Sequence, residues 1–275
     1  MRSDAGELGR VGIVGTGQIG TAIGMALARS CTARSVALLD RDPATARRSA
    51  ERIGGAAVLG GLDELGDADV VVLAVPVPMI VDLIEPVTRV LSGGALLVDT
   101  GSAKVVVVDA MRRHAGNGVH VVGGHPIAGT EGPGPDAADP AVFEDSTFVL
   151  TPVRDDPEGL DRACRVARAL ASRPVVMDAA EHDAAVAVAS HLPHLLAFSM
   201  TAAAGGSPPL AASGYESVTR LARSDPEMVG GFLWANAPQI RRAAEGFRRE
   251  FDRILQTLDE GPRSVMECLR MGGLP

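Results

Sequence analysis

Aromatic residues are scarce in this chain of 275 residues, at 3% of the total. A core must therefore be built mostly from Ala, Val, Leu and Ile, and the hydrophobic content of 46% is ordinary for a globular protein. Basic charge is also in deficit. The formal net charge of −8 argues against a nucleic-acid binder, because such proteins normally carry a basic face. An anionic substrate would have to be attracted by locally placed cations.

Cysteines and long apolar runs are few as well. The three cysteines, Cys31, Cys164 and Cys268, are far apart and odd in number, which excludes a disulfide framework or a CxxC metal pair. We expect them to be small buried hydrophobes in a reducing compartment. The N-terminal MRSDAGELGR has no apolar signal core, and the longest apolar run, Val70–Ile80, is too short to span a bilayer. We therefore expect a cytoplasmic protein that binds neither membrane nor nucleic acid.

Short apolar segments alternate with helix-like segments from residue 10 to about 178. The predicted strands are Val11–Gly15, Ser35–Asp40, Asp69–Val75, Ala95–Asp99, Val119–Gly123, Thr147–Leu150 and Val175–Met177. The first five are continuous apolar runs, which are typical of a parallel sheet covered on both faces. Helices are predicted between strands, for example over Ile19–Ser30 and Pro43–Ile53, the second with Asp42 as its N-cap. This alternation predicts an α/β fold with a doubly wound, mostly parallel sheet of the Rossmann type.

Strand signals stop after Asp178. Helices are predicted over Ala180–Ala204, over Met228–Leu258 with an interruption at Pro238, and over Arg263–Arg270. We therefore divide the chain into a nucleotide-binding domain of residues 1–178 and an all-helical domain of residues 179–275.

A dinucleotide-binding fingerprint, GTGQIG, follows the first predicted strand. Gly15 permits the tight turn, Gly17 lets a pyrophosphate approach the backbone, and Gly20 allows the helix to pack closely on the strand. The pyrophosphate would lie over Gly17, Gln18 and Ile19, at the N-terminus of the helix. The alternative is a glycine-rich turn that binds no nucleotide.

Asp40 ends the next predicted strand, 25 residues after Gly15. A carboxylate near this offset accepts hydrogen bonds from ribose hydroxyls and repels a 2′-phosphate, so NAD is favoured over NADP. The neighbouring Arg41 weakens this inference, because it can stack on adenine or pair with the additional phosphate.

The ends of the later strands carry further candidates, because ligands of open α/β sheets bind outside the carboxyl ends of the strands. Pro76 follows the third strand, Ser102 the fourth and His125 the fifth, all on the rim that holds the glycine loop. His125 can act as general base toward a substrate hydroxyl, or it can be a loop histidine held by Pro126. Ser102 can orient the histidine or bind substrate, but alone it is better explained as the N-cap of the next helix.

Longer motifs resemble the prephenate and arogenate dehydrogenase family over nearly the whole chain. They are VGIVGTGQIG near the start, DTGSAK at Asp99–Lys104, GGHPIAGTEGPG at Gly123–Gly134, SHLPH at Ser190–His194 and GYESVTRLARSDPEM at Gly214–Met228. The resemblance implies a Rossmann domain followed by a helical domain that forms a homodimer. It also implies NAD-dependent oxidation of a cyclohexadienyl acid with loss of carbon dioxide. Prephenate, which gives 4-hydroxyphenylpyruvate, leads as substrate, with arogenate and 4-amino-4-deoxyprephenate as alternatives.

The same resemblance implies roles for individual residues. His125 would accept the proton of the ring hydroxyl, and Ser102 would lie beside that hydroxyl and the nicotinamide. Arg220 would bind the carboxylate on the ring carbon, as a guanidinium does bidentately, and His194 would line the substrate pocket. The other expected substrate-binding residues are Thr130, Glu131, which would hold or screen Arg220, and His182 near the pocket mouth.

Other interpretations of these residues have less support in the sequence. His191 and His194, three residues apart, would form half a metal site, but no Cys or carboxylate at ligand spacing accompanies them and hydride transfer needs no metal, so none is expected. Trp234 and the pair Phe232–Leu233 are expected to be helix-packing core. A 3-hydroxyacid dehydrogenase would carry a catalytic lysine in the helical domain, and residues 179–275 contain no lysine. The alternative of another class is a non-catalytic NAD-binding module.

Overall fold

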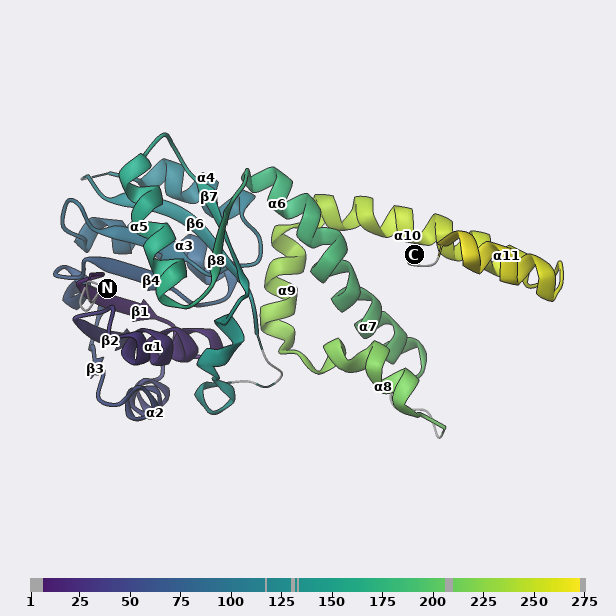
Figure 1. The fold of residues 1–275 in the computed structure, drawn as a ribbon, viewed down its shortest axis with the longest axis horizontal. Helices are drawn as coiled ribbons and strands as arrows, with labels where there is room; N and C mark the ends of the chain where they lie inside the picture. Colours follow the sequence, from purple (N-terminus) through teal and green to yellow (C-terminus); the bar gives the residue numbers. More distant parts are fainter. Residues whose placement is uncertain (1–6, 117, 130–131, 133, 206–209, 273–275) are drawn as a thin grey trace.

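The computed structural model describes residues 7–116, 118–129, 132, 134–205 and 210–272, and it contains an α/β domain followed by a helical domain (Figure 1). The strands are β1 Arg10–Val14, β2 Ser35–Leu39, β3 Ala57–Val58, β4 Val70–Leu73, β5 Leu96–Asp99, β6 His120–Ile127, β7 Thr147–Pro152 and β8 Arg173–Val176. They form one sheet in the order β3-β2-β1-β4-β5-β6-β7-β8, in which β6 and β7 pair antiparallel and all other neighbours pair in parallel. The doubly wound, mostly parallel sheet predicted from the sequence is confirmed.

Helices cover both faces of this sheet. They are α1 Gln18–Ser30, α2 Pro43–Ile53, α3 Val77–Val90, α4 Val105–His114 and α5 Pro157–Ala169. One buried cluster joins α1, α2 and α5 to strand residues such as Val70 and Val72, and the other joins α3 and α4 to their neighbours Val71 and Leu73. Because successive strand side chains point to opposite faces, the continuous apolar runs of the sequence supply both clusters.

The strand register brings the loops after β1, β2, β4 and β5 to one edge of the sheet. Val14 at the end of β1 pairs with Leu39 and Leu73, and Leu73 pairs with Asp99 at the end of β5. The glycine loop, Asp40 and the loop that contains Ser102 all follow these ends. This is the edge at which ligands of open α/β sheets bind.

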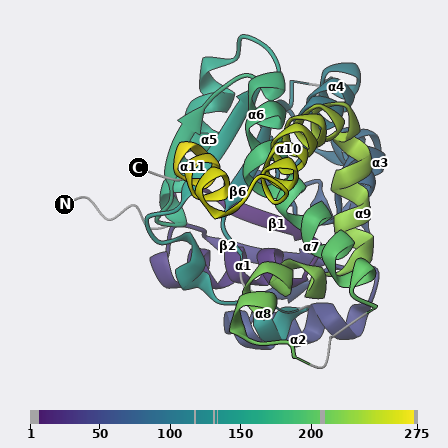
Figure 2. The same cartoon turned by 90° about the vertical axis from the view of Figure 1, so that its right-hand side faces the viewer.

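The helical domain begins with one continuous helix, made of α6 Ala179–Val186, a π-helical turn Ala187–His191 and α7 Leu192–Ala203. It continues with α8 Ser213–Thr219, a 3₁₀ turn Arg220–Arg223, α9 Pro226–Ala235, α10 Ala237–Thr257 and α11 Pro262–Gly272. Helix α9 packs against the α/β domain, where Gly231 allows close approach to Pro78 of α3. Helices α10 and α11 form an arm that points away from the body of the molecule (Figures 1 and 2).

The structure corrects several sequence-based expectations. His125 does not follow a strand but lies within β6, which extends to Ile127 because β7 pairs with it on the outer side. Trp234 is not core, since 72% of it is exposed, whereas Phe232 is buried as expected. Cys31 is exposed, while Cys268 is buried. The interruption near Pro238 falls at Asn236, so that the proline sits in the first turn of α10, where it is tolerated.

Candidate active site

The glycine loop has the geometry that a dinucleotide requires. Gly15 has φ +92°, and a side chain there, or on Gly20, would collide with the carbonyl oxygen of Ala74 or of Gly15 respectively. A Cβ on Gly17, in contrast, would meet nothing within 4 Å among the described residues. Gly17 is the N-cap of α1 and no side chain caps this helix, so its first amides point into that open space. The loop therefore fits a pyrophosphate at the positive end of the helix.

Asp40 is fixed beside this loop. Its Oδ2 accepts hydrogen bonds from the backbone amide of Thr16 at 2.7 Å and from the Thr16 hydroxyl at 2.9 Å, and its Oδ1 accepts from the amide of Asp42 at 3.0 Å. The negative charge is therefore held at the carboxyl end of β2, next to the open side of the glycine loop. Arg41 points instead toward the helical domain, where its guanidinium lies 3.8 Å from Glu227 of α9 in an exposed ion pair.

The sheet edge also carries a hydrogen-bonded line of two histidines and a carboxylate. Nδ1 of His125 lies 2.8 Å from Nε2 of His182, and Nδ1 of His182 lies 2.8 Å from Oδ1 of Asp183. His125 is half-buried, whereas His182 and Asp183 are fully buried on α6. His182, which we expected near the pocket mouth, is instead 1% exposed and lies against Nδ1 of His125, and its helix α6 packs against α4 and β7.

Burial determines the protonation state of His125. Desolvation holds the pKa of its imidazole well below the ordinary value, and the nearby His182, Lys104 and His191 lower this pKa further. A histidine with a lowered pKa is neutral at ordinary pH, so its ring is able to accept a proton.

Asp183 also joins the two domains. Its Oδ1 accepts a hydrogen bond from the amide of Lys104 at 2.6 Å, and its Oδ2 accepts from the amide of Val105 at 3.0 Å. These amides begin α4, so the carboxylate caps this helix from the other domain. The expectation that Ser102 caps α4 is therefore wrong. Ser102 lies half-buried in the β5–α4 loop, directly before the residues that Asp183 holds.

A buried ion pair supports the other side of the site. The ammonium of Lys104, which is 0% exposed, donates to Oδ2 of Asp99 and, at 2.6 Å, to the carbonyl oxygen of Gly124. Asp99 accepts in addition from the amides of Gly101 at 2.8 Å and Gly124 at 2.9 Å. The pair therefore ties the loop that contains Ser102 to the residue before His125.

The two histidines of SHLPH flank one aromatic ring. His191 stacks on Phe232 with ring centroids 4.5 Å apart, and His194 meets the same ring edge-on at 5.2 Å. Asn236 lies 3.1 Å from Nδ1 of His191 through its side-chain amide, and burial lowers the pKa of His191 to about 4. His194 is half-buried, and its Nδ1 donates to the carbonyl of Ser190 at 2.9 Å. Nε2 of His194 is therefore the nitrogen left to meet a ligand.

Of the remaining predicted site residues, Pro76 and Arg220 lie on elements other than those that carry the histidines described above. Pro76 is the N-cap of α3 at the end of β4, on the same edge as the glycine loop. Arg220 begins the 3₁₀ turn after α8, is exposed, and packs with this turn against α7. Thr130 and Glu131 lie outside the described residues.

Sequence reasoning missed Asp99, Lys104, Asp183 and Asn236 as parts of the site. Asp99 and Lys104 stand in the DTGSAK motif, and Asp183 adjoins His182, so their positions carried a signal. Nothing in the sequence indicated that these side chains are buried and bonded to one another. Within the described part of the chain, no group of three or more potential metal-ligand side chains gathers.

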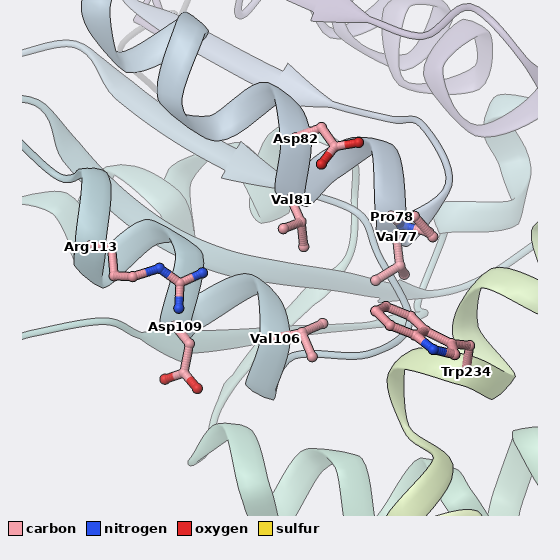
Figure 3. Close-up of a pocket in the computed structure, with 8 residues that line it drawn as sticks. All are labelled: Val77, Pro78, Val81, Asp82, Val106, Asp109, Arg113 and Trp234. Atoms are coloured by element: carbon pink, nitrogen blue, oxygen red, sulfur yellow. The ribbon is translucent and has the colours of Figure 1, made fainter.

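A separate surface pocket of about 320 Å³ lies where α3, α4 and α9 meet (Figure 3). Trp234 closes one end of it beside Val77 and Pro78, and Asp109 and Arg113 of α4 lie at the other end (Figure 3). None of the histidines described above lines it.

Comparisons with known families match both parts of the chain. The profile of the prephenate dehydrogenase nucleotide-binding domain matches residues 23–176, and that of the prephenate dehydrogenase dimerization domain matches residues 178–270.

Individual proteins give the same result. The cyclohexadienyl dehydrogenase of Zymomonas mobilis is 28% identical over 254 residues, which cover 89% of this chain and 86% of that enzyme. The crystal structure of prephenate dehydrogenase from A. aeolicus in complex with hydroxyphenyl propionate and NAD+ superposes with a TM-score of 0.86 at 27% identity, over 95% of each chain. That of Synechocystis arogenate dehydrogenase superposes with a TM-score of 0.77 at 26% identity, over 95% of this chain and 96% of the other.

Proposed function

The chain belongs to the prephenate dehydrogenase family, and from this premise we propose that it oxidises prephenate with NAD and releases carbon dioxide, giving 4-hydroxyphenylpyruvate. The observation that carries the proposal is His125. It is a histidine with a lowered pKa, within a strand that borders the sheet edge where the glycine loop lies. A neutral imidazole at that place is the base that oxidation of a ring hydroxyl requires.

The reaction divides the chemistry between cofactor and protein. NAD, when bound, supplies the oxidation by taking a hydride from C4 of the ring. His125 takes the proton of the C4 hydroxyl, so that a ketone develops. The developing ketone weakens the bond between C1 and its carboxylate, carbon dioxide leaves, and the ring becomes aromatic. General base help of this kind contributes about 10²–10⁴-fold to the rate.

Two features support NAD as the cofactor. The carboxylate of Asp40 is held beside the glycine loop by Thr16, where it would accept from ribose hydroxyls and repel a 2′-phosphate. The guanidinium of Arg41, which would favour the extra phosphate, is directed to Glu227. The solved relative from A. aeolicus contains NAD+, which agrees with this assignment.

The substrate acid needs cations and polar groups, because the chain carries a net charge of −8. We assign Arg220 to the ring carboxylate, and Ser102 and His194 to contacts with the substrate. Thr130 and Glu131, which follow His125 in the same motif, are assigned to the pocket by the resemblance alone. Arogenate is the second candidate substrate, because a solved relative is an arogenate dehydrogenase.

We further propose a homodimer formed by the helical domain. Helices α10 and α11 leave apolar side chains exposed on a single chain, including Phe251 (49%), Leu255 (44%) and Leu269 (52%). Among the described residues, the helix Ala179–Ala203 is long and apolar enough to cross a membrane by length and composition. Only 28% of its apolar 18-residue segment is buried within a single chain, so this helix also exposes apolar surface. Exposed apolar surface of this extent marks an interaction site, and a second copy would cover it. The match to a dimerization domain supports this assignment.

The direct test is NADH absorbance with purified protein. Prephenate, arogenate and 4-amino-4-deoxyprephenate are each supplied with NAD and then with NADP. We expect the largest kcat/KM for prephenate with NAD. A higher kcat/KM for arogenate would transfer the assignment to the second candidate. Absence of reduced cofactor with every combination would refute the proposal and leave a non-catalytic NAD-binding module.

A further inference from the structure

We propose that His182 and Asp183 are positioning residues that set the tautomer of His125, leaving Nε2 of His125 as the nitrogen that accepts the substrate proton. The inference rests on the proposed function, in which His125 is the general base. It adds that His182 and Asp183 keep the ring of His125 in the tautomer that can act as a base. It is carried by the unbroken line of hydrogen bonds from Asp183 through His182 to His125.

The line starts from a carboxylate that can only accept. Asp183 is 1% exposed, and its two oxygens accept hydrogen bonds from the backbone amides of Lys104 and Val105. A peptide N–H is always a donor, so both oxygens are acceptors. Nδ1 of His182, 2.8 Å from Oδ1, must therefore carry the hydrogen of that contact.

The choice at His182 fixes the choice at His125. A neutral imidazole carries one hydrogen, so a hydrogen on Nδ1 of His182 leaves a lone pair on its Nε2. That lone pair lies 2.8 Å from Nδ1 of His125, which must then be the donor. Nε2 of His125 is left with a lone pair, which is the state a general base needs. Without the carboxylate, His182 is able to turn the direction of both hydrogen bonds, and Nε2 of His125 then carries a hydrogen and cannot act as base.

The same line accommodates the charge that the reaction creates. The O–H bond of the substrate breaks and an N–H bond forms at Nε2 of His125, which makes His125 an imidazolium. Its Nδ1 then donates to the lone pair of His182, and Nδ1 of His182 donates to Asp183, so that the line of hydrogen bonds ends on a carboxylate. Burial, His182, Lys104 and His191 disfavour a positive charge on His125, and Asp99 partly offsets the ammonium of Lys104. In this proposal Asp183 stabilises the charge through His182, whose Nδ1 it contacts.

The first test measures the tautomer of His125 directly and does not depend on enzyme activity. Long-range ¹⁵N–¹H spectra of uniformly labelled protein distinguish ring nitrogens that carry hydrogen from those with a lone pair. The chain has only six histidines, so a His125→Asn sample assigns its signals by difference. At neutral pH we expect hydrogen on Nδ1 and a lone pair on Nε2 of His125 in the unaltered protein. In Asp183→Asn, whose side chain has one acceptor oxygen in place of two, we expect a substantial population with hydrogen on Nε2. Hydrogen on Nε2 of His125 in the unaltered protein would overturn the inference.

The second test reads kinetics. Asp183→Asn should lower kcat by about 10²–10⁴-fold, the worth of a general base, with KM little changed. A wrong tautomer is not a protonation defect, so raising the pH should not restore kcat. His182→Gln offers a side-chain carbonyl to Nδ1 of His125, and it should retain more kcat than His182→Leu, which offers none.

The chain contains a matched control. Asp156 contacts Nδ1 of His120 at 2.8 Å through Oδ2 and caps α5 by accepting from the amide of Gly159 at 3.0 Å. Asp156→Asn thus removes a carboxylate that contacts a histidine and also caps a helix, as Asp183→Asn does. His120 lies at the opposite end of β6 from His125. Asp156→Asn should cost comparable stability and leave kcat unchanged.

The outcomes separate the two proposals. An unaltered protein that oxidises none of the substrates refutes the proposed function, while its spectra still decide the tautomer. An active protein in which Asp183→Asn keeps its kcat, or loses no more than Asp156→Asn, refutes the positioning role. If Asp183→Asn does not fold, the spectra of the unaltered protein and the ratio of kcat between His182→Gln and His182→Leu decide, and equal kcat in these two variants refutes the inference.

Discussion

Replacing Lys104 by Met should destabilise the fold far more than replacing any surface cation. Lys104 is the only lysine of the chain, which otherwise uses arginine, and it is 0% exposed. Its ammonium donates to Asp99 and to the carbonyl of Gly124, so Lys104→Met leaves a buried carboxylate without its counter-charge and a buried carbonyl without its donor. Breaking a buried ion pair by removing one partner costs about 3–5 kcal/mol of unfolding free energy.

The direction of the Lys104 pKa sharpens this prediction. Burial lowers the pKa of the ammonium even though Asp99 raises it, so desolvation outweighs the attraction between the partners. The pair therefore contributes less to stability than the attraction between its two charges alone. Asp99→Asn combined with Lys104→Met removes the stranded charge and should be more stable than Lys104→Met alone.

Urea denaturation followed by circular dichroism measures these free energies. Arg112→Met is the control, because Arg112 forms an exposed ion pair with Asp109 at 2.6 Å and should cost less than about 1 kcal/mol. The reasoning is refuted if Lys104→Met costs no more than the control, or if the double variant is no more stable than Lys104→Met.

Three further predictions follow. Arg220→Ala should weaken substrate binding by about 2–5 kcal/mol, which raises KM at least about thirtyfold. Arg223→Ala, on the same turn, is the control and should change KM little. An unchanged KM in Arg220→Ala would remove the assignment of Arg220 to the substrate carboxylate.

The pKa of His191 is about 4 in the folded state, below the ordinary value of 6.5. The contribution of neutral His191 to the free energy of unfolding is therefore fully present above pH 6.5, and the free energy of unfolding falls by about 3 kcal/mol as the pH drops toward 4. Denaturation curves against pH should show a shallower fall for His191→Gln, and an unchanged slope would contradict this. Phe251→Asp should convert the dimer into a monomer, as measured by light scattering. Val58→Asp, at an exposed apolar residue of β3, is the control and should leave the dimer intact. A Phe251→Asp variant that remains a dimer would exclude α10 and α11 as the interface.

Local patterns in the sequence were sufficient for the fold and the cofactor loop. Continuous apolar runs such as Val70–Leu73 predict a sheet buried on both faces, and Gly15, Gly20 and Asp40 occupy the positions that their spacing requires. These features depend on residues near one another in the chain, or on the general rule that parallel strands end at one edge.

Contacts between distant segments could not be predicted in the same way. The amide of Lys104 is bonded by Asp183, 79 residues later, so the true cap of α4 is invisible to a rule that looks for Ser or Asp just before a helix. The length of β6 depends on its antiparallel partner β7, and so the position of His125 within a strand was missed. Trp234 was assigned to the core from its residue type, but its exposure depends on which face of α9 meets α3.

The base assignment on which the account depends is tested most directly by kcat of His125→Asn with prephenate and NAD. Asparagine retains a polar side chain near that of histidine in size but cannot take a proton at neutral pH. We predict a kcat lower by about 10²–10⁴-fold with KM little changed. A variant that keeps most of its kcat would contradict the assignment of His125 as the base.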